Sequence, residues 1–555
     1  MNWSGPTEPP PDPVIPPRSE PPETDETIGT DPAARPQITP FTGVSPIPPP
    51  PPPPPTPDSL LAPGGWAPGP DRAPAPRRRL RRPWVLASIA GVCAVALAGA
   101  AIGVFAGDDG GPDYPEEWDQ RVVDLVDFVE RERGLTFDHP VDVDFLPDAA
   151  FLAEIGTDDS ELDDDEQAER DEFDRQYTAA FRALGVAEGD ISLFDEAEAL
   201  TDAGTVAFYR FRDDRIIVRG TELDTATKVT VVHELTHALQ DQHFDLDSLN
   251  ASEDDDEYRA DPTALVEGDA TRIENAYVDE LSASERREYE RQSDDQVDDD
   301  AFDDIPLILQ LLRAAPYTLG NQWIAVIETA GGDEAIDAAF ENPPLTDEHY
   351  FDPASFDRRT KTESVETFSE VDDDVTIVVD NDQFGSLGWY LMLGEQIDSR
   401  TAMQAALGWG GDAYRIIDDG DDVCAQLRFV GDTGADTDEM FDALEEWRDA
   451  LPFGDDIDLD RDGDEIDLES CDPGVTTKAI TTDDADIAFT RQFVRLQTIR
   501  GLVDDDVADL ESATCFADHV AIEISDDDLV SEEISTRGRS VIFAGFAECD
   551  IEPGG

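Results

Sequence analysis

The chain has 555 residues and a formal net charge of −91, which comes from 130 acidic and 39 basic residues. This charge disfavours nucleic acid and anionic lipid surfaces as partners of the folded part, and it is typical of halophilic proteins, because salt screens the repulsion between acidic groups. A hydrophobic content of 39% nevertheless predicts globular cores rather than a wholly disordered acidic chain.

The N-terminal part divides into two segments of different composition. Residues 1–76 are rich in proline, with an unbroken run from Pro48 to Pro55. They predict a disordered cytoplasmic segment with a stiff spacer, or a ligand for a proline-binding domain. Residues 77–107 hold five arginines and then an uncharged stretch, residues 84–106, long enough to cross a bilayer. We expect a single-pass anchor in the cell membrane with the remaining chain outside; a cleaved signal peptide is the alternative.

Apolar periodicity predicts several elements ahead of the first chemical motif. Residues 116–133 and 173–184 have helical spacing, whereas residues 141–146 alternate like a strand. Residues 205–211 and 215–218 predict two strands around an Asp213-Asp214 turn.

The stretch from Val231 to Phe244 reads V-V-H-E-L-T-H-A-L-Q-D-Q-H-F. On a helix, His233 and His237 lie one turn apart on one face and are able to hold one zinc ion. Glu234 is then placed to take a proton from a zinc-activated water. A surface helix with two histidines by chance is the alternative, but three of the six histidines of the chain fall in this stretch.

A third protein ligand is needed, and two residues qualify. His243 has the spacing of the metzincin motif, but Gln240 stands where that motif has glycine, so a continuing helix carries His243 away from the metal. Glu267 lies early in a second predicted helix, where a carboxylate is able to reach the first helix. We favour Glu267, with His243 interacting with the carbonyls at the end of the helix.

These motifs carry a family resemblance. V-H-E-L-T-H-A-L-Q-D-Q-H-F, A-L-V-E-G-D-A and G-W-G-G-D resemble bacterial, actinobacterial-type metallopeptidases of the gluzincin class, which are secreted or membrane-anchored. The resemblance spans roughly residues 114–474. It implies an α+β, zincin-like catalytic domain with a small edge sheet, and hydrolysis of protein or peptide substrates by a zinc-activated water. In gluzincins an edge strand pairs with the substrate, and residues 215–218 are our candidate for that strand; a purely structural hairpin is the alternative.

The resemblance also implies a hydrogen-bond donor to the transition state and a carboxylate that orients a histidine. Tyr317, His349 and Tyr350 are the candidates for the donor, although structural packing is the alternative for each. Thr271 stands where thermolysin-type gluzincins have the orienting aspartate, and Asp269 lies two residues after Glu267. The sequence therefore leaves the orienting partner open.

The C-terminal part predicts an α+β subdomain over residues 401–486 and a helix with a small unit over residues 487–555. One segment fits the calcium-loop formula of EF-hands and predicts either a calcium site or a hairpin turning at Asp462-Gly463. The ligands of that calcium site would be Asp458, Asp460, Asp462, Asp464 and Glu469. Four cysteines lie outside the apolar stretch, and proximity favours disulfides between Cys424 and Cys471 and between Cys515 and Cys549.

Together these features predict a membrane-anchored extracellular zinc metallopeptidase with its catalytic domain in residues 112–400. Two other functions fit the same residues: a zinc amidase acting on cell-wall material, and a structural zinc-binding module without turnover. The oligomeric state and the identity of the substrate do not follow from the sequence.

Overall fold

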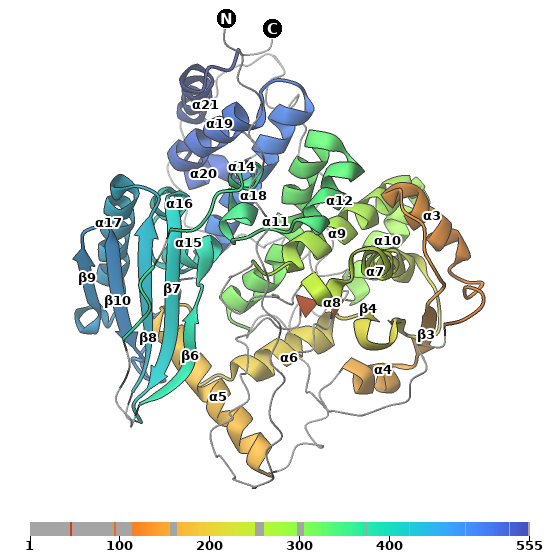
Figure 1. The fold of residues 1–555 in the computed structure, drawn as a ribbon, viewed down its shortest axis with the longest axis horizontal. Coiled ribbons are helices and arrows are strands. Elements are labelled where there is room, and N and C mark those ends of the chain that lie inside the picture. The colour runs from red at the N-terminus through yellow and green to blue at the C-terminus, as the bar shows by residue number, and fades with distance from the viewer. Residues whose placement is uncertain are drawn as a thin grey trace, which may run out of the picture. The chain divides into compact units, whose positions relative to one another are not determined.

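The computed structural model describes residues 45–46, 94–95, 114–155, 164–249, 260–296 and 305–552, except 364, 370, 372–374, 421, 483 and 532. All of them belong to one compact unit, Thr42–Gly555. The fold is α+β, as predicted, with a three-stranded sheet, a five-stranded sheet and many helices (Figure 1). Two further strands of two residues each, β1 (Ser45–Pro46) and β2 (Ala94–Val95), pair with each other in antiparallel fashion.

The structure does not support the predicted membrane anchor. The transmembrane helix expected as part of the fold, and the localisation in the cell membrane that depended on it, are both corrected here. Residues 84–106 lie outside the described part except for Ala94–Val95, which form the short strand β2 rather than a helix. Among the helices that the structure describes, none is both long enough and apolar enough to cross a bilayer. The longest of them, α11 (Leu307–Gly331), carries Arg313 and Glu328 and has several other polar residues along its length.

The three-stranded sheet has the order β3-β5-β4. Its strands are β3 (Asp142–Leu146), β4 (Ala207–Arg210) and β5 (Arg215–Arg219), with β5 parallel to β3 and antiparallel to β4. Ile216 and Val218 of β5 pack towards α7 (Thr225–Phe244), while Ile217 packs on the other face against Phe151 of α4 (Asp148–Ile155). The three middle residues of this central strand are apolar and buried because both of its faces are covered.

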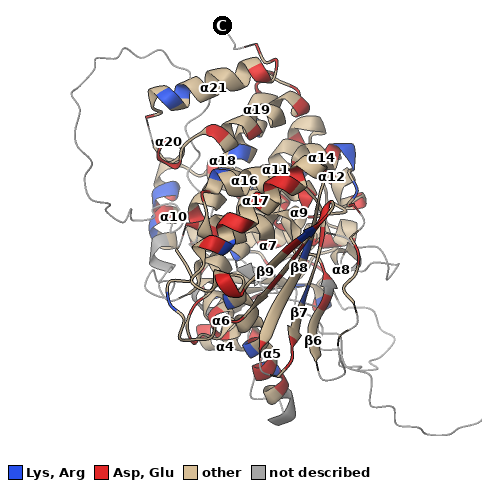
Figure 2. Cartoon of the chain, turned by 90° about the vertical axis from the view of Figure 1, so that its left-hand side faces the viewer, with Lys and Arg blue, Asp and Glu red and all other residues tan. Residues whose placement is uncertain are grey.

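The five-stranded sheet has the order β6-β7-β8-β10-β9 and is antiparallel. Its strands are β6 (Thr376–Asp382), β7 (Trp409–Asp418), β8 (Val423–Gly431), β9 (Asp458–Asp462) and β10 (Glu465–Cys471). The helix α17 (Gly434–Ala450) packs on this sheet through Met440, Leu444 and Trp447, while its other face carries exposed acidic residues (Figure 2).

Asp412, in the G-W-G-G-D block, joins this sheet to a neighbouring helix. Its buried carboxylate accepts hydrogen bonds from the indole Nε1 atoms of Trp389 and Trp409, at 2.8 and 2.7 Å. It also accepts from the backbone N–H groups of Phe384 and Gly385, at the start of α15 (Gly385–Gln396). Burial outweighs these hydrogen bonds and raises the pKa of Asp412 to about 6. The block therefore has a structural role.

Both disulfides that proximity favoured are present. Cys424 and Cys471 face each other in the register of β8 and β10, and their bridge ties these two strands together. Cys515 of α19 (Leu510–Glu523) is bonded to Cys549, the residue after α21 (Thr536–Glu548). Each bridge closes a loop in the folded C-terminal part, which limits the freedom of the unfolded chain.

The remaining helices complete the packing around the two sheets. They are α3 (Val123–Arg133), α5 (Asp164–Ala183), α6 (Leu193–Gly204), α8 (Leu246–Leu249), α9 (Thr263–Glu280), α10 (Ala283–Gln296), α12 (Asp333–Glu341), α13 (Glu348–Phe351), α14 (Pro353–Arg358), α16 (Ser399–Leu407), α18 (Ala485–Asp504) and α20 (Asp526–Leu529). The largest hydrophobic cluster contains side chains from α5, α15, α17 and α18, so one core runs through all three predicted folded parts.

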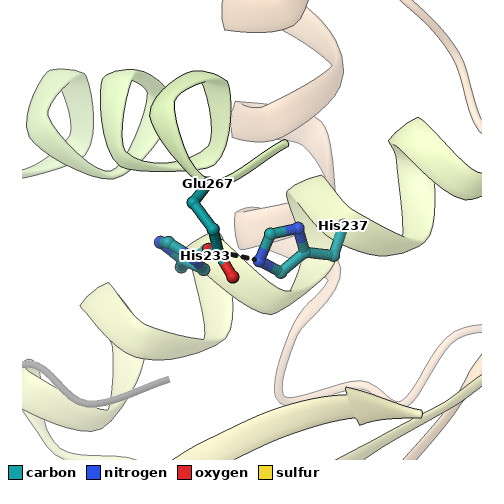
Figure 3. Close-up of side chains that lie close together, drawn as sticks. All are labelled: His233, His237 and Glu267. Carbon is teal, nitrogen blue, oxygen red and sulfur yellow. Dashed lines mark hydrogen bonds and ion pairs between the residues drawn. The ribbon is translucent and has the colours of Figure 1, made fainter. Parts of the chain in front are cut away.

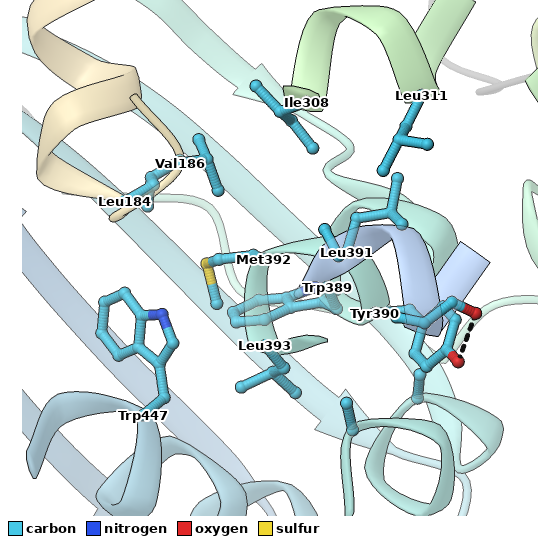
Figure 4. Close-up of a cluster of buried hydrophobic side chains, with 14 of the residues drawn as sticks. Leu184, Val186, Ile308, Leu311, Trp389, Tyr390, Leu391, Met392, Leu393 and Trp447 are labelled. Carbon is cyan, nitrogen blue, oxygen red and sulfur yellow. Dashed lines mark hydrogen bonds between the residues drawn. The ribbon is translucent and has the colours of Figure 1, made fainter. Parts of the chain in front are cut away.

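Helix α11 connects two hydrophobic clusters. Ile308 and Leu311, in its first turns, pack in the large cluster with Trp389 and Leu391 (Figure 4). Further along, Trp323 and other residues of the helix belong to a second cluster that includes residues of α9. The middle of α11, around Pro316 and Tyr317, therefore lies where the large cluster meets the region of α9.

Candidate metal centre

The helix that carries the H-E-L-T-H motif is buried for most of its length. Asp224 caps its N-terminus by accepting from Thr227 N at 3.0 Å. Packing against the three-stranded sheet, α3, α9 and α10 leaves His233, Glu234 and His237 with 0% exposure. Burial of this kind explains the apolar side chains on several faces of the helix, among them Val229, Val232 and Leu239.

Two histidines of α7 and one glutamate of α9 converge (Figure 3). Their potential ligand atoms all lie within 4.8 Å of one another, and all three side chains are buried. Glu267 Oε2 is 3.1 Å from His233 Nε2 and 3.2 Å from His237 Nε2. The group formed by His233, His237 and Glu267 is able to bind a metal ion, and the third member is the residue that the sequence favoured.

Close contact between two glycines positions Glu267. A Cβ atom added to Gly268 would lie 2.5 Å from the backbone of Gly320, so α9 and α11 touch at this point. Tyr317, one turn before Gly320, donates its hydroxyl to Glu267 Oε1 at 2.7 Å. The carboxylate is thus oriented by α11 while its other oxygen faces the histidines.

Each histidine has a second partner on its Nδ1 atom. Glu274 Oε2 lies 2.9 Å from His233 Nδ1, and Gln240 Oε1 lies 3.0 Å from His237 Nδ1. If each Nδ1 carries the proton, both Nε2 atoms point their lone pairs towards the shared site. Glu274 and Gln240 therefore orient the two histidine rings.

The acidic neighbours dominate the protonation of His233. Burial disfavours its charged form, but hydrogen bonds and charges from Glu267 and Glu274 outweigh burial and raise the pKa of His233 to about 10. Burial raises the pKa of Glu274, whereas the two histidines hold the pKa of Glu267 below its ordinary value despite its burial. The cluster without metal therefore binds a proton that a cation would displace.

Asp269 contacts Gln240, the residue that orients His237. It accepts a hydrogen bond from Gln240 Nε2 at 3.0 Å and from the buried Arg133 Nε at 2.8 Å. Arg272 and Arg133 lower the pKa of Asp269 against the effect of its burial. Asp269 thus acts on His237 through Gln240, and not by the direct contact that a thermolysin-type pattern implies.

Glu234 is fixed by the strand next to it. Its Oε2 accepts from the backbone N–H of Tyr209, in β4, at 2.7 Å. Because β5 lies between β3 and β4, our candidate for a substrate-pairing strand, residues 215–218, is wrong: both edges of β5 are already paired. The strand beside Glu234 is β4, which lies at the edge of its sheet.

The other residues singled out from the sequence lie elsewhere. His243 Nε2 contacts Thr136 O at 2.8 Å, away from the three ligands. His349 accepts from Leu345 N through Nδ1 and contacts Thr360 O through Nε2, so both ring nitrogens have structural partners. Tyr350 is half-buried, with its ring packed edge-on against Trp323. Of the three proposed donors, Tyr317 is the one whose hydroxyl reaches the metal group.

The acidic segment that fits the EF-hand formula forms a hairpin instead. Its residues are distributed along β9 and β10, with Glu469 opposite Asp458 and a turn at Gly463, whose φ is +71°. Among the described residues, the one group arranged to hold a metal is His233, His237 and Glu267. The hairpin, which was the alternative to a calcium site, is therefore the structure that this segment adopts.

The sequence analysis did not identify the residues that support the site. It missed Glu274 and Gln240 as partners of the two histidines, and Arg133 as the partner of Asp269. Glu274 follows Glu267 by seven residues, which is two helical turns on one face, so this signal was available. Arg133 lies more than a hundred residues before Asp269 and no local pattern links them.

Comparison of the chain with family models, with curated proteins and with solved structures finds no match. The gluzincin resemblance therefore stays a prediction from the motifs.

Proposed function

We propose that the chain is a zinc-dependent peptidase. The observation that carries the proposal is the buried group of two histidine Nε2 atoms and one carboxylate oxygen, next to the buried carboxylate of Glu234. This donor set is the one that catalytic zinc uses when it keeps a fourth position open.

The separations between the donors support zinc. Tetrahedral zinc with bonds of about 2.0–2.1 Å places neighbouring ligand atoms about 3.3 Å apart. Glu267 Oε2 lies 3.1 and 3.2 Å from the two histidine nitrogens, so these two separations are within a few tenths of an ångström of that value. Zinc bound there supplies a Lewis acid that polarises a carbonyl and lowers the pKa of water.

The protein residues then divide the work. Glu234 accepts the proton of the attacking water and delivers it to the leaving amine. Tyr209 N holds one oxygen of that carboxylate at 2.7 Å, which fixes the direction in which the other oxygen points. Tyr317 holds Glu267, so it is a positioning residue rather than a donor to the transition state.

The edge of β4 supports a peptide as the substrate. Arg219 N donates to Val206 O at 2.8 Å, which makes Phe208 and Arg210 the next residues to bond with β5. The backbone groups of Ala207 and Tyr209 are therefore directed away from β5. The N–H of Tyr209 is bonded to Glu234, so an extended peptide laid along this edge would pair with the backbone of Ala207 and the carbonyl of Tyr209. This mode of recognition is known as β-addition.

A Glu234→Gln variant tests the proposal. We expect zinc content, measured by mass spectrometry, to be unchanged and hydrolysis of an unfolded protein in molar salt to fall by about 100-fold or more. Glu222→Gln, an exposed glutamate in the loop before α7, is the matched control and should keep full activity. Full hydrolysis by Glu234→Gln would refute the peptidase mechanism.

A further inference from the structure

Arg313 differs from the other arginines of the chain. Within the described residues, every other arginine that is at least partly buried hydrogen bonds or ion-pairs with another residue, as Arg133, Arg272 and Arg359 do. Arg313 is partly buried and has no such partner among the described residues. Burial lowers the pKa of its guanidinium well below the ordinary value, and a weaker charge interaction with Tyr317 opposes this shift.

The place of Arg313 in α11 relates it to the metal centre. It lies four residues before Tyr317, so both side chains emerge from one face of the helix, about 6 Å apart along its axis. Tyr317 reaches Glu267 with its hydroxyl. An extended peptide advances about 3.3 Å per residue, so the separation of about 6 Å along α11 corresponds to about two residues of a substrate.

A guanidinium without a partner among the residues that the structure describes is unusual in this protein for an electrostatic reason. The chain has 130 acidic residues for its 39 basic ones, so acidic partners are abundant. A buried charge without a partner costs free energy, and functional sites are where such a cost is retained. The planar fork of an arginine matches a carboxylate with two parallel hydrogen bonds.

We propose that Arg313 binds a carboxylate of the peptide substrate and makes the enzyme selective for peptides that carry one near the scissile bond. The carboxylate is either the α-carboxylate of a substrate's C-terminus or the side chain of an aspartate or glutamate. The inference rests on the peptidase function proposed above. It adds a substrate class to that function, since acidic peptides are otherwise repelled by the net negative charge of the protein.

Binding to a zinc-loaded Glu234→Gln protein tests the proposal without requiring turnover. Two matched pairs of fluorescent peptides are used in molar salt: a free C-terminal acid against its amide, and an aspartate peptide against its asparagine counterpart, with the acidic residue moved along the sequence. We expect the acid of at least one pair to bind about 10- to 100-fold more tightly than its neutral partner. The pair that shows the preference identifies the source of the carboxylate.

Adding Arg313→Gln should abolish the preference for the acid peptide and leave the affinity for the neutral peptides within about twofold. Arg313→Lys should retain part of the preference, because the positive charge remains. Arg537→Gln, which removes the same charge at an exposed position of α21, is the control and should change nothing. Zinc content and thermal unfolding show that each variant folds.

Equal binding of acid and neutral peptides overturns the proposal, as does a preference that survives Arg313→Gln or a complete lack of peptide binding. Failure of the peptidase function would look different. It would appear as full turnover by Glu234→Gln, or as acid-selective binding that depends on Arg313 in a wild-type protein that hydrolyses no peptide.

Discussion

Replacing Glu274 by alanine is expected to weaken zinc binding about 10- to 100-fold, because loss of a residue that orients a histidine ligand has an effect of this size. Glu274 Oε2 lies 2.9 Å from His233 Nδ1, and the two side chains are 2% and 0% exposed. A buried hydrogen bond to a charged group contributes about 1.5–3 kcal/mol. At about 1.4 kcal/mol for each factor of ten, that range corresponds to between one and two powers of ten.

A second substitution separates the hydrogen bond from the charge. Glutamine at position 274 still accepts a hydrogen bond from Nδ1–H but carries no negative charge, so the loss for Glu274→Gln should be smaller than for Glu274→Ala. Glu280→Ala is the control, since Glu280 lies on the same helix with a side chain that is 63% exposed.

Zinc affinity is measured by competition with a fluorescent chelator in molar salt, and circular dichroism checks that each variant is folded. An unchanged dissociation constant in folded Glu274→Ala would refute the orienting role of Glu274. A comparable loss in Glu280→Ala would show that the effect is a general consequence of altering α9.

Two further predictions concern stability. Gly268→Ala is expected to lower the free energy of unfolding by about 1–3 kcal/mol and to weaken zinc binding, because the new Cβ would lie 2.5 Å from the backbone of Gly320 and push α9, with Glu267, away from α11; urea unfolding and the chelator assay measure both. Burial raises the pKa of Glu348 to about 7, against an ordinary value of 4.5. Between these two pH values folding takes up a proton, so the free energy of unfolding falls as the pH rises through 7. Urea unfolding at pH 5 and pH 8 should show that wild type loses up to about 3 kcal/mol more than Glu348→Gln over this interval; equal losses would contradict the assignment.

The members of the candidate metal centre were predictable because their geometry is largely local. A four-residue spacing places His233 and His237 on one helix face, and the same regularity carries His243 away from them. Glu267 required an additional step, since its position depends on how a second helix packs. Its place early in an apolar, helical segment was enough to favour it over His243.

The orienting residues were not predictable to the same degree. Gln240 was read as a departure from a motif, yet it joins His237 to Asp269 in the fold. The order of strands in the small sheet could not be read from a hairpin alone, because β3 joins from outside the hairpin and pairs with β5. That pairing makes β4 the edge strand and places it beside Glu234.

The sequence by itself determined the H-E-L-T-H helix, the pairing of the four cysteines in the C-terminal part that proximity favoured, and the acidic character of the surface. These properties depend on composition, on helical periodicity or on short separations along the chain. Tertiary structure decided which strand borders the site, which side chains orient the histidines and which arginine has no acidic partner in the part of the chain that the structure describes. Each of those depends on contacts between residues far apart in the chain, and such contacts are set by how whole helices and sheets pack together.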